Sequence, residues 1–61
     1  MKIIAKGNYD SENRSDFLIA TGLNEHYASL IARLLNAHEP EGAEYFYVAV
    51  EDDYVLYEWK P

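Results

Sequence analysis

Carboxylates are the side chains of this sequence whose number and spacing could do chemistry. They gather in two stretches, one with Asp10, Glu12 and Asp16 and the other the unbroken run of residues 51–53. Carboxylate oxygens at such spacing can bind a basic protein surface or coordinate a hard cation such as calcium. Calcium is the weaker interpretation, because there is no EF-hand spacing and no glycine shapes a binding loop. We therefore expect no metal site and consider these residues as a surface for a basic partner.

The histidines and serines form no recognisable catalytic pattern. The only histidines are His26 and His38, and we interpret His38 as a residue at the end of a helix, where an imidazolium is favoured. His26 follows Glu25, and acid–base catalysis would need a nucleophile or second titrating group converging with it in a pocket. The sequence has no cysteine, no glycine-rich phosphate loop and no His-Glu-x-x-His run. We expect neither an enzyme nor a bound cofactor.

Length and charge narrow the classes of function further. The chain has 61 residues, and 11 acidic residues against 5 basic ones give a net charge of −6. DNA, RNA and anionic membranes require a positive face, so we expect no direct binding to nucleic acid or membrane. Residues 1–61 are expected to form one domain, near the lower size at which a chain folds without disulfides or metals. The first apolar stretch is too short for a signal peptide, so a cytoplasmic protein is expected.

An apolar stripe predicts one long helix over about residues 16–38. Apolar side chains recur at intervals of three and four residues, Ser15 is a suitable N-cap, and Pro40 lies just beyond the end. Gly22 is the difficulty, since glycine inside a helix costs about 1 kcal/mol. In the alternative, residues 17–21 form a strand that ends at Gly22, and a shorter helix begins after Asn24 as its cap. We favour the continuous helix because the stripe passes Gly22 in phase and because LIATGLNEH resembles the later LIARLLNAH.

Two runs of alternating aromatic and β-branched residues predict a C-terminal β-hairpin, 44–51/54–60, turning at Asp52 and Asp53. In that register Val50 faces Val55, and every pair on one face is apolar. With a first strand at residues 2–7, the expected fold is α+β: a β-α-β-β chain whose three-stranded sheet packs on the long helix. The neighbour of the first strand in the sheet is left open. The expected core is Ile3, Ala5, Ile19, Leu23, Tyr27, Leu30, Ile31, Leu34, Phe46, Val48, Val50, Val55, Tyr57 and Trp59.

This arrangement predicts two interaction surfaces. The end of the first strand, the start of the helix and the hairpin turn would meet at one end of the molecule. They would form an acidic surface of Asp10, Glu12, Asp16, Glu51, Asp52 and Asp53. In the structural alternative these residues only cap the helix and make turns. The open face of the sheet would carry a second, aromatic surface of Ile4, Tyr45, Tyr47, Tyr54 and Leu56, suited to an interface but also compatible with a solvated face.

We therefore hypothesise a small acidic protein-interaction module that inhibits or modulates a partner with a basic surface, such as a protein that handles nucleic acid. In size and charge the chain is similar to short acidic proteins of phages and mobile elements that block host enzymes. The alternative hypothesis is a homo-oligomeric structural or accessory protein, a dimer formed through the tyrosine-rich face.

Overall fold

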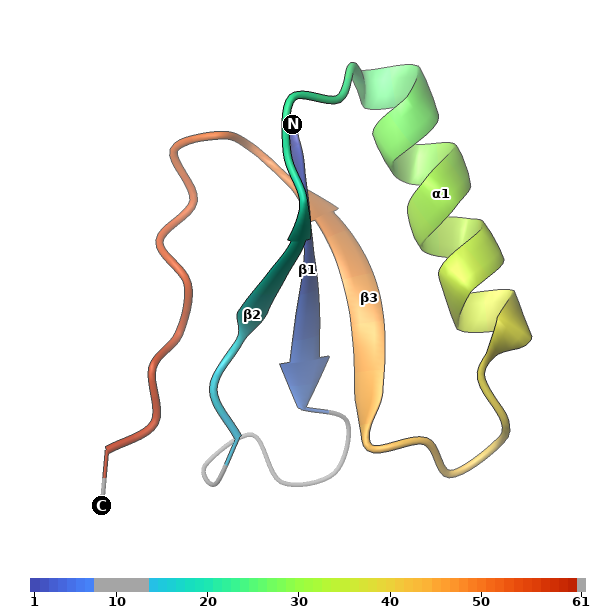
Figure 1. The fold of residues 1–61 in the computed structure, drawn as a ribbon, viewed down its shortest axis with the longest axis vertical. Coiled ribbons are helices and arrows are strands. Elements are labelled where there is room, and N and C mark those ends of the chain that lie inside the picture. The colour runs from blue at the N-terminus through green and yellow to red at the C-terminus, as the bar shows by residue number, and fades with distance from the viewer. Residues whose placement is uncertain (8–13, 61) are drawn as a thin grey trace.

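The computed structural model describes residues 1–7 and 14–60 (Figure 1). Its elements follow in the order β1 (Lys2–Gly7), β2 (Phe17–Ala20), α1 (Glu25–His38) and β3 (Tyr45–Val50). The strand order in the sheet is β2-β1-β3 with both pairs antiparallel, so β1 is the central strand. The predicted class, an α+β fold with a three-stranded sheet and one helix, is confirmed. Two of its elements differ from the prediction.

The first difference is the start of the helix, because the continuous helix over residues 16–38 is wrong. Phe17–Ala20 is a strand, and α1 begins at Glu25. Gly22 has a φ of 75°, a left-handed conformation that cannot continue a right-handed helix and suits glycine. The Asn24 side chain then caps α1 by accepting a hydrogen bond from the Tyr27 N–H at 2.9 Å.

The second difference is the C-terminal hairpin, which does not form. β3 pairs with β1 along the full length of both strands, from Lys2 opposite Val50 to Gly7 opposite Tyr45. Residues 54–60 are not a strand. The predicted turn exists, since the Tyr54 N–H donates to the Glu51 carbonyl at 3.0 Å. Beyond it the chain crosses to the far side of β2, which takes the expected place of residues 54–60 as third strand (Figure 1).

The helix lies beside β3 and covers the edge of the sheet (Figure 1). Its two buried residues are Ala28 and Ala32, whose small side chains allow close approach. The Asn36 side chain donates to the Tyr47 carbonyl at 2.8 Å and accepts from the Tyr47 N–H at 2.7 Å. This amide therefore occupies hydrogen-bonding groups on the outer edge of β3 that a further strand would otherwise use.

The core is smaller than predicted. The buried apolar residues among those described are Ile3, Ile4, Ala5, Ala28 and Ala32. Ile3 and Ala5 confirm the prediction. The following expected core residues instead expose between 38 % and 85 % of their surface: Ile19, Tyr27, Leu34, Phe46, Val55 and Tyr57. The physical reason is that the helix is shorter than expected and lies at one edge of a flat molecule, whose Cα atoms span 34 × 28 × 10 Å.

Candidate interaction surfaces

The acidic residues predicted to form one surface are divided by the fold. Asp10 and Glu12 lie outside the described residues. The turn of residues 51–53 is exposed and lies at the same end of the molecule as the start of α1 (Figure 1). Asp52 pairs there with the Met1 ammonium at 3.1 Å. Asp16 is buried near the opposite end of β1, because it precedes β2 and not the helix. Of the six, the described residues thus bring together Glu51, Asp52 and Asp53.

Asp16 is the centre of a polar cluster that also contains Lys6 and Tyr54. Its carboxylate accepts hydrogen bonds from the Lys6 Nζ at 3.1 and 3.2 Å, from the Tyr54 hydroxyl at 3.2 Å and from the Tyr57 N–H at 2.8 Å. Lys6 also donates to the Tyr54 hydroxyl at 2.8 Å. That bond raises the pKa of Lys6, burial opposes the increase, and the Asp16 carboxylate adds to it. The cluster therefore fastens residues 54–57 to β1 and to the start of β2.

The predicted aromatic surface is also divided. Ile4 is completely buried, and it shares one face of β1 with Lys2 and Lys6, which both bond to Tyr54. Tyr45 and Tyr47 are opposite Gly7 and Ala5, so they lie on the other face of the sheet. Tyr54 and Leu56 belong to the segment beyond β3, outside the sheet. The five residues therefore do not form one exposed face.

The structure instead exposes apolar side chains on both faces of β2, here together called the apolar surface on β2, in a segment that the favoured prediction assigned to a helix. Leu18 is opposite Ile4 and lies on that face, whereas Phe17 is opposite Ala5 and lies on the other face with Ile19. Phe17, Leu18 and Ile19 expose 45 %, 49 % and 41 % of their surface. In the segment beside them, Val55 exposes 85 % and Tyr57 42 %. The signal for this strand is the Phe-Leu-Ile-Ala run ending at Thr-Gly, followed by a capping asparagine. It is the basis of the alternative stated in the sequence analysis, a strand that ends at Gly22 before a helix capped by Asn24, and the structure has that arrangement.

Most basic side chains form contacts within the chain, whereas several acidic side chains are exposed without such contacts. Three of the five basic side chains bond within the chain: Lys2 to the Tyr54 carbonyl at 3.1 Å, Lys6 to Asp16, and Arg14 to Glu44 at 3.5 Å. Several exposed acidic side chains have no hydrogen bond or ion pair among the described residues, namely Glu25, Glu41, Glu51, Asp53 and Glu58. Free surface charge is thus mainly negative.

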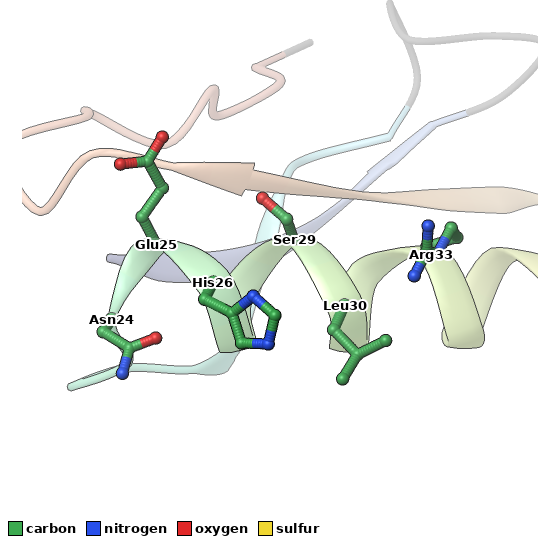
Figure 2. Close-up of a pocket in the computed structure, with 6 residues that line it drawn as sticks. All are labelled: Asn24, Glu25, His26, Ser29, Leu30 and Arg33. Atoms are coloured by element: carbon green, nitrogen blue, oxygen red, sulfur yellow. The ribbon is translucent and has the colours of Figure 1, made fainter.

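A shallow hollow lies along the outer side of α1, lined by Asn24, Glu25, His26, Ser29, Leu30 and Arg33 (Figure 2). Figure 2 shows that these side chains leave one helix in different directions, with Glu25 pointing away from the His26 ring. Acid–base or nucleophilic catalysis requires such groups to converge within hydrogen-bonding distance. No group of three or more potential metal ligands is found within residues 1–7 and 14–60.

Comparison with known proteins assigns no family to the chain. No protein-family model matches it, and neither a curated protein nor a solved structure matches it significantly. In the part of the chain that the structure describes, no helix is long and apolar enough to cross a membrane. Inference about function therefore depends on the residues of this chain alone.

Proposed function

We propose that this chain is a small acidic protein-interaction module that acts by binding another protein and not by catalysis. The observation that carries the proposal is the run of three half-exposed apolar side chains in β2, Phe17, Leu18 and Ile19. Val55 and Tyr57 are also exposed, in the neighbouring segment that a hydrogen bond from the Asp16 N–H to the Tyr57 carbonyl joins to the start of β2. Single exposed apolar residues are ordinary, whereas several exposed apolar side chains on one outer element of a small domain are typical of an interface. Phe17 and Ile19 share one face of β2, and Leu18 lies on the other face with Ile4.

Charge indicates the kind of partner. The net charge is −6, and the exposed acidic side chains are mostly unpaired while most basic ones are used internally. A negative surface speeds association with a positive one, whereas apolar contact provides most of the affinity. We therefore propose a cytoplasmic partner with an apolar patch bordered by basic residues, such as a protein that handles nucleic acid, which the chain would inhibit or modulate.

Affinity capture from a lysate of the source cell, with elution at rising salt and identification by mass spectrometry, tests the proposal. The captured protein is then measured against three variants. Leu18→Ser removes apolar surface from β2, and we expect at least a tenfold loss of affinity. Leu34→Ser is the matched control, because Leu34 is 59 % exposed but lies on α1. Reversing the charge of Asp52 and Asp53 to lysine should slow association at low salt, and the difference should disappear near 0.5 M salt.

Equal effects of Leu18→Ser and Leu34→Ser would contradict a binding role for β2. An association rate that is unchanged by the charge reversal at low salt would contradict the proposal that the partner surface is basic.

Self-association is the second candidate function, favoured by the small number of fully buried apolar side chains among the described residues. It would make the chain a homo-oligomeric structural or accessory protein. Because the predicted tyrosine-rich face is not formed, the interface would be the apolar surface on β2. A dimer that dissociates on Leu18→Lys would support this candidate, and a monomer at tens of micromolar would count against it.

A further inference from the structure

Residues 54–60 have the composition of a strand but do not form one. The segment alternates Tyr54, Leu56 and Glu58 with Val55, Tyr57 and Trp59, a pattern rich in β-forming residues. In the structure it runs beside β2 without a ladder, and one backbone–backbone hydrogen bond joins it to the start of β2, from the Asp16 N–H to the Tyr57 carbonyl at 2.8 Å. Its strand-forming capacity is therefore largely unused.

Among residues 1–7 and 14–60, the groups that hydrogen-bond to this segment belong to β1 and to the two residues before β2. Lys2 and Lys6 bond to Tyr54, Asp16 bonds to the Tyr57 backbone, and the Ser15 hydroxyl accepts from the Trp59 N–H at 2.9 Å. No hydrogen bond among the described residues joins the segment to α1, and its link to β3 is the turn itself. A second copy of the chain could offer the same groups in the same geometry.

The connection between β3 and the segment is short and highly charged. Glu51, Asp52 and Asp53 carry the chain from β3 past the ends of β1 and β2 to the far side of the sheet (Figure 1). Three adjacent acidic residues are exposed in this tight turn, and one of them, Asp52, pairs with the Met1 ammonium. Opening the turn would break the hydrogen bond from the Tyr54 N–H to the Glu51 carbonyl, which is a contact of the turn alone.

We propose that residues 54–60 are exchanged between two copies of this chain. In the dimer the turn opens, β3 continues through residues 51–53 as one long strand, and the segment of each copy binds Ser15 and Asp16 of the other. Exchange of an identical element keeps the contacts that the segment makes with β1, Ser15 and Asp16 and loses only those within the turn, so it costs little free energy. It is independent of the proposed partner protein, since it requires only this chain.

Electrostatics determines the conditions under which the exchange should appear. Each copy carries a net charge of −6, and the two opened turns would bring their carboxylates close together. Salt at 0.5 M shortens the screening length to a few ångströms, so the dimer should become more abundant with salt as well as with concentration.

Two variants of the turn test the proposal in opposite directions. The closed form contains a four-residue turn, in which the Tyr54 N–H donates to the Glu51 carbonyl at 3.0 Å. Deletion of Asp52 and Asp53 removes both central residues of this turn and joins Glu51 directly to Tyr54, so the closed turn of the monomer cannot form. We expect this variant to be a folded dimer at every concentration. Asp52→Asn with Asp53→Gly introduces a dipeptide that strongly favours tight turns and should give only monomer.

A pair of cysteines reports which copy supplies the segment. The Ser15 Oγ and the Trp59 nitrogen are 2.9 Å apart, so cysteines at these two positions are within bridging reach in a chain that has no other cysteine. Each protein is equilibrated at 10 and 500 μM in 0.5 M NaCl, oxidised, and separated by denaturing electrophoresis without reductant. We expect dimers linked by disulfides in the deletion variant, monomers with an internal disulfide in the Asn-Gly variant, and a dimer fraction of the natural turn that rises with concentration.

A deletion variant that folds as a monomer, by circular dichroism and light scattering, would overturn the proposal. If that variant does not fold, the cysteine pair in the protein with the natural turn provides the test. Disulfides that stay within one chain at 500 μM exclude exchange, even where light scattering finds a dimer, because such a dimer associates through its surfaces.

Discussion

Hydrogen bonds of polar side chains hold several elements of this molecule together, since few apolar side chains among the described residues are fully buried. Asn36 satisfies the edge of β3, Asp16 holds the segment beyond the turn, and the Tyr47 hydroxyl donates to the Glu39 Oε1 at 2.8 Å. Hydrogen bonds to charged groups are stronger than those between neutral groups, and they depend on protonation. Their contribution can therefore be measured through pH.

Tyr47 makes the fold sensitive to alkali. Its hydrogen bond to Glu39 raises the pKa of the hydroxyl above 10.0, and burial and the negative charge of Glu39 add to the increase. The protonated form is thus favoured in the folded state, so its contribution to the free energy of unfolding is complete below pH 10 and is lost as the pH rises through the raised pKa. Lys6 has the same sign, since its pKa is raised above 10.5. We expect the urea midpoint to fall above about pH 10.

The Tyr47→Phe variant separates the contribution of Tyr47 to this pH dependence from that of Lys6. The difference in urea midpoint between the natural protein and the variant should be constant at pH 8–9 and decrease above pH 10. Glu39→Gln keeps an acceptor but removes the charge, so part of the increase in the pKa of Tyr47 should remain. A difference that stays constant to pH 11.5 would show that the Tyr47 hydroxyl contributes nothing through its proton.

Gly22 lies between the end of β2 and the start of α1. The sign of the change in the free energy of unfolding on Gly22→Ala distinguishes this arrangement from a continuous helix. In the structure Gly22 has a φ of 75°, and a Cβ added there would meet no atom within 4 Å. Any cost of Gly22→Ala is therefore backbone strain, and we expect a loss of about 1 kcal/mol in the free energy of unfolding. In a continuous helix the same substitution would be stabilising by about 1 kcal/mol. Urea denaturation measures the difference.

Glu25→Ala is a useful comparison, since it places alanine at an exposed position inside α1 without a positive φ. It should change stability by well under 1 kcal/mol. Stabilisation by Gly22→Ala would favour the continuous helix and contradict the strand–turn–helix arrangement.

The pairing of β3 and the strand at residues 17–20 show how far the fold and the site could be predicted from the sequence alone. Local patterns were sufficient for the strand at residues 2–7, the helix end near His38 and the turn after β3. The partner of β3 was not predictable from pattern, because residues 2–7 and 54–60 both match its apolar alternation. The repeat around Gly22 favoured a helix, whereas pairing with β1 made residues 17–20 a strand. The predicted surfaces depended on this topology, so the apolar surface on β2 was missed.

At the scale of the whole molecule, stability is concentrated in the middle of the sheet. β1 is paired on both sides and carries the fully buried Ile3, Ile4 and Ala5. The segment of residues 54–60 is held by side chains and by single hydrogen bonds. A small domain of this kind therefore opens in parts, with the outer segment released before the central strand.

Amide hydrogen exchange measured by NMR tests this order of release. We expect the amides of β1 to exchange slowest, at the rate of global unfolding, with protection of about 10²–10⁴ for a domain of this size. The Tyr57 and Trp59 amides, which donate to Asp16 and Ser15, should be protected about tenfold, and the Val55 amide hardly at all. Asp16→Asn should reduce protection at Tyr57 more than in β1, because a neutral amide is a weaker acceptor than a carboxylate. Equal protection of Tyr57 and β1 would mean that the segment leaves only when the whole fold does, and exchange between copies would then require global unfolding.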